Sequence, residues 1–232
     1  MPTARESLLD AALAALGGRP WPGVRMVDVA VAAKVSRQTL YNEFGSKDGL
    51  ARALVRREVD RYLVGVRHAL TGPGPGDPGD RLAALADWTV RTSRHNPLVR
   101  ASLTGCWGER LPRPPRLAAP PPSGMSVGSG TSVGAVGAGG AGGAGGAGGS
   151  GGYLPAQRRA DGPLPSPAEL TGQVRDLAAA ALTPGRPPEE VLRAAGLCEI
   201  AVRLTLSCVV APVGEQEAGR LVRRALRLGG GI

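Results

Sequence analysis

The stretch that most constrains the fold lies between residues 27 and 50, which read VDVAVAAKVSRQTLYNEFGSKDGL. Its spacing predicts two short helices joined by a tight turn, with small apolar residues of the first helix facing inward. Val35 supplies an apolar plug in the turn. Ser36 is a good N-cap, because its hydroxyl oxygen can accept a backbone N–H from the first turn of a following helix. We therefore expect a helix-turn-helix motif over residues 27–44.

The second predicted helix runs from Arg37 to about Phe44 and has two different faces. Leu40 and Phe44 would lie inward. The residues that would face mostly outward can form hydrogen bonds, and none of them is acidic: Arg37, Gln38, Thr39, Tyr41 and Asn42. A helix that enters a major groove needs such a face. Arg37 is suited to guanine and Gln38 to a bidentate pair with adenine, and Thr39 to a thymine methyl group or a phosphate.

The order VAxAAxVSxxTLYxxFxSKxxL resembles the DNA-binding signature of the TetR family of bacterial repressors. The match combines the Val-Ser turn, the Thr-Leu-Tyr triplet, Phe44 and the Ser-Lys pair that ends in Lys47. One position departs from the family, which usually has Gly where this chain has Lys34. A left-handed backbone at that position would be slightly strained with a lysine.

The resemblance implies that Tyr41 and Lys47 hold phosphates and set register. The other interpretation of Tyr41 is a half-buried core ring. The expected DNA contacts are therefore Ser36, Arg37, Gln38, Thr39, Tyr41, Asn42 and Lys47. The phrase VSRQTLYNEFGSK is also similar to actinobacterial members of the family linked to alkane and fatty-acid oxidation, which implies a long-chain apolar effector.

Capping signals place further helices around the motif. Thr3 to Glu6 form a capping box that begins a support helix. Ser46 caps a helix that continues to about Leu70 and is long enough to join two domains. Two more helices follow between Asp77 and about Trp107.

Residues 112–165 have no usable periodicity and are rich in Pro, Gly and Ala. Such a segment cannot bury enough apolar surface to offset its ordering entropy, so we expect a disordered insert. It contains a formal GxGxxG, but no strand precedes this pattern and no helix follows, which argues against a nucleotide site. Its arginines leave two interpretations open: a solvated linker, or contact with nucleic acid.

Order is expected to return at Ser166, which begins another capping box. Residues 189–211 form the most apolar predicted helix, and a helix apolar around much of its circumference is usually buried on several sides. Residues 215–228 predict a helix with one apolar face and one Arg face. Together they carry more apolar surface than one chain covers. We expect a homodimer through residues 189–228, in agreement with the four-helix interface that the family resemblance implies.

The resemblance also implies an apolar pocket between the fourth and eighth helices, for a small apolar effector that no sequence feature selects. Candidate wall residues are Tyr62, Trp88, Thr92, Trp107, Glu199 and Arg203. Plain core packing explains each of them equally well. Glu199 and Arg203 have i,i+4 spacing and could simply pair with each other.

Composition narrows the remaining choices. The formal net charge of +9 favours a polyanion as partner. The three cysteines lie far apart and show neither metal-ligand nor disulfide spacing, so we expect reduced thiols, no metal and no cofactor. No catalytic motif, signal peptide or membrane segment is evident. These features indicate a protein that is not an enzyme and that acts in the cytoplasm, in association with the nucleoid.

The sequence thus predicts an all-α chain: a helix-turn-helix DNA-binding domain at residues 1–47, a helical ligand-binding and dimerisation domain at 48–111 and 166–232, and the insert at 112–165. The expected function is transcriptional regulation, by a repressor that a small apolar ligand releases from a palindromic operator. The alternative is a non-specific, architectural nucleic-acid-binding protein that uses the Arg-rich insert and C-terminus.

Overall fold

The computed structural model describes residues 3–71, 77–113, 163–185, 187–214 and 216–228. Regular structure within these ranges is helical, which confirms the all-α prediction. The helices are α1 (Ala4–Gly18), the 3-10 turn η1 (Trp21–Gly23), α2 (Met26–Ala32), α3 (Arg37–Phe44), α4 (Lys47–Leu70), α5 (Pro78–His95), α6 (Pro97–Thr104), α7 (Pro167–Leu182), α8 (Pro188–Val210) and α9 (Glu217–Leu228). Most of the insert expected at residues 112–165 lies outside the described residues.

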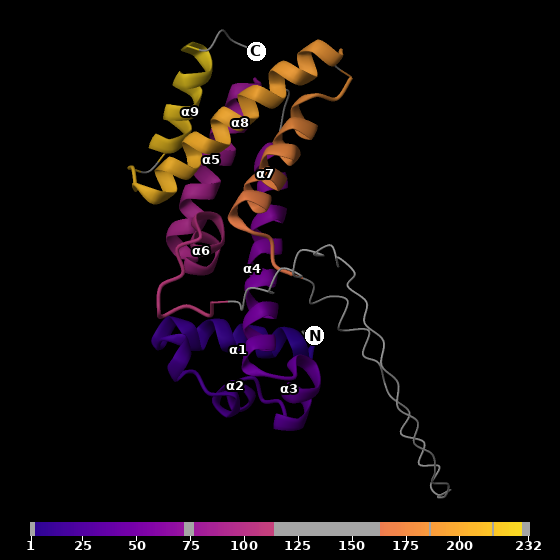
Figure 1. Ribbon diagram of the computed structural model, residues 1–232, viewed down its shortest axis with the longest axis vertical. Coiled ribbons are helices and arrows are strands. Elements are labelled where there is room, and N and C mark those ends of the chain that lie inside the picture. Colours follow the sequence, from indigo (N-terminus) through magenta and orange to yellow (C-terminus); the bar gives the residue numbers. More distant parts are fainter. Residues whose placement is uncertain (1–2, 72–76, 114–162, 186, 215, 229–232) are drawn as a thin grey trace, which may run out of the picture.

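Helices α1 to α3 form a small domain at one end of the molecule, shown at the bottom of Figure 1. Its core contains Leu8 and Ala12 of α1, Val29 of α2, and Leu40 and Phe44 of α3, all buried. These residues recur at helical spacing, so each short helix has one apolar side that only its neighbours can cover. The packing of three small helices thus fixes α3 on the outside of this domain.

Helix α4 connects this domain to the rest of the chain and spans roughly 36 Å at 1.5 Å per residue. The Ser46 hydroxyl begins the helix by accepting the Gly49 N–H at 3.1 Å. Gly49 is needed here, since a Cβ at this position would lie 1.9 Å from the carbonyl oxygen of Phe44. The tight corner between α3 and α4 therefore depends on a glycine in the first turn of α4.

The second half of the molecule is a helical bundle in which α5 packs against α4, α8 and α9, and α7 packs against α8. Figure 1 shows α8 and α9 at the end of the molecule opposite to α1–α3. Two glycines allow close packing. A Cβ on Gly65 of α4 would lie 2.1 Å from the ring of Trp88, and Gly219 of α9 donates its N–H to the Asp87 carboxylate of α5 at 2.8 Å.

Several expected details differ in the structure. Thr3 caps α1 as expected, but the Glu6 carboxylate lies 3.5 Å from Arg57 of α4 and leaves the predicted capping box half formed. Helix α6 ends at Thr104 and not near Trp107, because Gly105 adopts a left-handed conformation with φ of 73°. Ser166 and Glu169 form the complete capping box that the sequence predicts at the start of α7.

Lys34 has a φ of 55°, as expected for the turn position that favours glycine. We predict that Lys34→Gly raises the free energy of unfolding by roughly 0.5–1 kcal/mol, because relief of the left-handed strain outweighs the added freedom of the unfolded chain. The matched control, Ala32→Gly at an exposed site in α2, should lower it by about as much. Urea denaturation measures both changes in the free energy of unfolding. Destabilisation by Lys34→Gly would contradict the backbone strain assigned to Lys34.

Candidate nucleic-acid interface and effector cavity

The helix-turn-helix presents α3 through local hydrogen bonds. The Ser36 side chain accepts the Thr39 backbone N–H at 3.0 Å, and the two hydroxyls lie 2.8 Å apart. In the turn, Val35 donates its N–H to the Ala30 carbonyl. Gly45, with φ of 68°, ends the helix. Both ends of α3 are therefore fixed by residues that the sequence motif contains.

The outer face of α3 is polar and accessible. Gln38 donates from Nε2 to Oδ1 of Asn42 at 2.9 Å, and both side chains are exposed together with Arg37. Tyr41 is 49% exposed, so its ring is not enclosed by the core. Ser36, Arg37, Gln38, Thr39, Tyr41 and Asn42 thus share one short segment with free polar atoms on its surface.

Lys47 lies just beyond α3, at the first position of α4. Its ammonium donates to the Pro22 carbonyl at 3.0 Å and lies 5.5 Å from the centroid of the Trp21 ring. On α2, Asp28 accepts hydrogen bonds from Arg25 and Arg19, and the hydrogen bond from Arg25 is the main cause of its lowered pKa. The acidic residue of α2 is therefore neutralised by basic neighbours, while Lys47 holds a fixed position beside η1.

A chain of buried and partly buried polar contacts joins the two halves of the molecule. Arg57 of α4 is 8% exposed and donates to Asp10 of α1 at 2.7 Å and to Glu58 at 3.1 Å. Glu58, 4% exposed, accepts from the Asn96 side chain at 2.8 Å. The Asn96 oxygen in turn caps α6 by accepting the Leu98 N–H. Displacement of α6 relative to α1 would break these contacts, since all of them meet at one turn of α4.

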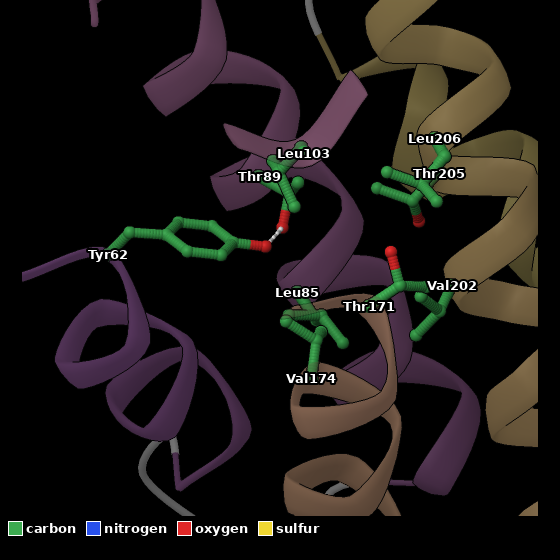
Figure 2. Close-up of a pocket in the computed structure, with 9 residues that line it drawn as sticks. All are labelled: Tyr62, Leu85, Thr89, Leu103, Thr171, Val174, Val202, Thr205 and Leu206. Carbon is green, nitrogen blue, oxygen red and sulfur yellow. Dashed lines mark hydrogen bonds between the residues drawn. The ribbon is translucent and has the colours of Figure 1, made fainter. Parts of the chain in front are cut away.

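The bundle encloses a cavity between α4, α5, α6, α7 and α8 (Figure 2). Its walls come from Tyr62, Leu85, Thr89, Leu103, Thr171, Val174, Val202, Thr205 and Leu206. The three threonine hydroxyls have partners: Thr89 pairs with the Tyr62 hydroxyl at 3.1 Å, and the other two donate to carbonyls of their own helices. The cavity volume is only about 10 Å³, room for at most a single water molecule.

The structure separates the six residues that the sequence suggests as pocket walls. Only Tyr62 lines this cavity. Trp88 packs over Gly65, Thr92 lies half-buried on the same helix, and Trp107 lines a different groove. Glu199 and Arg203 pair with each other at 2.5 Å, with the Arg203 side chain largely exposed. The i,i+4 spacing of Glu199 and Arg203 therefore corresponds to an ion pair on the surface, which was the simpler interpretation of these two residues from the sequence.

Three residues of the cavity wall were not predicted from the sequence: Thr89, Thr171 and Thr205. Thr205 lies on the buried side of α8 among Ala201, Val202 and Cys208. A hydroxyl within an apolar helix face can indicate a cavity wall, because a buried polar group needs a hydrogen-bond partner or a neighbouring cavity. Thr89 and Thr171 carry the same signal more weakly.

Tyr62 allows a prediction on pH dependence. Burial raises its pKa from 10.0 to about 12, so its contribution to stability is fully present below pH 10 and is lost as pH rises to 12. We expect a loss of roughly 2–3 kcal/mol in the free energy of unfolding over this interval. Burial also raises the pKa of Cys198, to about 11, so the measurement is the difference between the natural chain and Tyr62→Phe. Equal slopes in the two proteins would contradict the assignment.

Comparison with known proteins gives the N-terminal domain a family. Residues 8–54 match the family model described as "Bacterial regulatory proteins, tetR family". The HTH-type transcriptional regulator AlkX of Mycobacterium tuberculosis is 40% identical over 101 residues, which are 44% of this chain and 47% of that protein. The chain thus spans about half the length of the curated relatives it matches. This relative confirms the similarity to actinobacterial members of the family.

A solved structure extends the likeness in fold beyond the N-terminal domain. A tetR-family transcriptional regulator from Streptomyces coelicolor superimposes with a TM-score of 0.51 at 16% identity, over 98% of this chain and 81% of that one. The TetR family repressor AlkX from Dietzia sp., implicated in biodegradation of n-alkanes, gives 0.49 at 21% identity, over 97% and 96%. The N-terminal domain of the chain is thus similar to that of the TetR family of bacterial regulatory proteins.

Proposed function

We propose that the chain is a DNA-binding transcriptional regulator: a homodimeric repressor that a small apolar effector releases from a palindromic operator. The observation that carries this proposal is α3, a short helix capped at both ends whose exposed face is polar, in a domain that matches the tetR family model. In this function the protein works at the chromosome in the cytoplasm. Among the described helices, none is both long and apolar enough to cross a membrane.

The polar face of α3 suits direct reading of bases. Asn42 holds one N–H of the Gln38 amide, which leaves the second N–H and the amide oxygen for the bidentate pair that glutamine forms with adenine. Arg37 is exposed at the first position of the helix and is suited to guanine. Ser36, Thr39, Tyr41 and Lys47 would contact phosphates or the thymine methyl group and so set the register.

The dimer would form through α8 and α9. The exposed side of α8 carries Leu192, Gly196, Ile200 and Val210, with Leu192 76% and Ile200 54% exposed, and Arg203 and Ser207 interrupt this set on the same side. Within a single chain α8 is therefore not buried on several sides, as its sequence suggested, but only on the side facing the bundle. A second copy would cover this stripe, and Gly196 would allow close approach of the two helices. Two recognition helices could then occupy successive major grooves, about 34 Å apart.

The cavity around Tyr62 would take the effector. Its walls are apolar apart from hydroxyls that already have partners, which favours an apolar molecule. A ligand site normally has about 300–1,000 Å³, so the helices around it must separate before an effector fits. Helix α6 contributes Leu103 to the cavity and Asn96 to the polar contacts with α4. Displacement of α6 by an effector would thus strain the contacts that lead through Arg57 to α1.

The division between reading and positioning residues is testable in gel-shift titrations. Gln38→Ala should weaken binding to the preferred DNA sequence by about 1–3 kcal/mol and relax preference at one base pair per half-site. Lys47→Ala should weaken binding to all DNA sequences about equally, and it should reduce the slope of log affinity against log salt concentration by about one.

The matched control is Gln173→Ala, an exposed glutamine on α7, which should leave both affinity and salt slope unchanged. Identical behaviour of Gln38→Ala and Lys47→Ala would contradict the assigned roles. Loss of affinity for all sequences together as salt rises would favour the non-specific, architectural binder instead.

The dimer surface has its own test. Ile200→Glu places a charge in the middle of the exposed α8 stripe, and we expect monomers in sedimentation equilibrium at micromolar concentration because an unpaired charge in an apolar interface is costly. Ala180→Glu, on the exposed side of α7, is the control and should leave the dimer intact. A natural chain that is a well-folded monomer under these conditions would rule out the proposed dimer.

A further inference from the structure

A groove lies between α4, α6 and the start of α7, apart from the cavity around Tyr62. Helix α4 contributes Arg52, Val55 and Val59, and the far wall is formed by the segment from Pro163 to Pro167. Its volume is about 410 Å³, within the range of small-molecule sites. Helix α6 separates the two spaces, because Ser102 lines the groove while its neighbour Leu103 lines the cavity. We call this space the α4–α6–α7 groove.

Three polar groups in the groove have no partner among the residues that the structure describes. The Ser102 side chain is 5% exposed, and its buried hydroxyl has no hydrogen-bond partner among the described residues. A buried hydroxyl without a partner costs free energy and is uncommon in folded proteins. The guanidinium groups of Arg52 and Arg113 line the same groove and form neither an ion pair nor a hydrogen bond with any residue the structure describes. One hydroxyl and two cations thus converge on one space.

The acidic residue of the groove forms no ion pair with these cations among the described residues. Glu169 directs its carboxylate to the Ser166 backbone N–H at 2.7 Å, within the capping box of α7. The Ser166 hydroxyl accepts the Glu169 N–H in return. Ser166 and Glu169 therefore bind each other, and the groups without a partner among the described residues are two guanidinium cations and a hydroxyl donor. This set of donors fits a carboxylate, which accepts several hydrogen bonds at once.

The remaining surface is apolar and built from rings. Trp107 lines the groove together with Pro163, Pro165 and Pro167, and Val55 and Val59 complete it. The flat indole ring of Trp107 favours a flat apolar body, the proline rings add apolar surface beside it, and guanidinium planes also stack on aromatic rings. The combination of ring surfaces with two arginines differs from the Tyr62 cavity, whose described walls contain neither an arginine nor a tryptophan.

We propose that the α4–α6–α7 groove is a second small-molecule site, which binds an aromatic carboxylate. The carboxylate accepts hydrogen bonds from Arg52, Arg113 and the Ser102 hydroxyl, and the aromatic body lies against Trp107 and the proline segment. This inference does not rest on DNA binding or on an effector in the Tyr62 cavity.

Calorimetric titration of the full chain with 2-naphthoate tests the site. We expect saturable binding at one site per chain, weakened about tenfold or more by Arg52→Gln and by Arg113→Gln. Arg100→Gln, at an exposed position on α6 outside the groove, is the matched control and should bind normally. The neutral 2-naphthol should bind at least about tenfold more weakly, and the non-planar cyclohexanecarboxylate should also bind more weakly.

Ser102→Ala gives a readout that a purely structural role would not produce. Removal of the unpartnered hydroxyl should raise the melting temperature of the free protein by about a few degrees, while 2-naphthoate affinity falls. Leu85→Phe, which fills the Tyr62 cavity, should leave 2-naphthoate binding unchanged. Three results would overturn the proposal: no saturable binding at millimolar 2-naphthoate, affinity unaffected by the arginine substitutions, or loss of binding in Leu85→Phe at unchanged folding.

Discussion

The buried contact between Arg57 and Glu58 on α4 is the interaction on which the rest of the structure depends. Both side chains are almost fully removed from water, so each needs compensating partners that the neighbouring helices must supply. Asp10 of α1 accepts a hydrogen bond from Nη1 of the arginine, whose buried Nη2 has no partner among the described residues, and Asn96 at the start of α6 donates to the glutamate. Apolar packing alone would let these helices slide, whereas directional hydrogen bonds fix α1, α4 and α6 in one arrangement.

This arrangement gives the two ends of the molecule different mechanical roles. The N-terminal domain moves with α4 because α1 is tied to Arg57 and because Gly49 lets α3 turn directly into α4. The bundle end is more open to change. Helix α6 contacts both the Tyr62 cavity and the α4–α6–α7 groove, so a ligand in either space would press on the helix whose first residue is held by Glu58. Ligands in the two proposed sites would therefore act on the same hydrogen bond, between Asn96 and Glu58.

The sequence predicted the N-terminal domain better than the helical bundle for a physical reason. The caps at Ser36 and Ser46, the inward positions of Leu40 and Phe44, and the left-handed Lys34 are set within a few residues of chain, so local spacing reveals them. The cavity walls are different, because Tyr62, Thr89, Thr171 and Thr205 meet only through the packing of four helices. No local pattern shows that Trp107 lines a separate groove, or that Glu199 also lies within 3.5 Å of Arg175.

Selection from random double-stranded DNA by the purified full-length chain, at physiological salt, tests most directly whether α3 reads sequence. The account predicts enrichment of one palindrome whose half-site centres are separated by about 34 Å, or a multiple of it, along the helix axis. Bound sequences should remain enriched as salt is raised toward the point where random DNA is released. Recovery of no preferred sequence, with all DNA released together as salt increases, would contradict it.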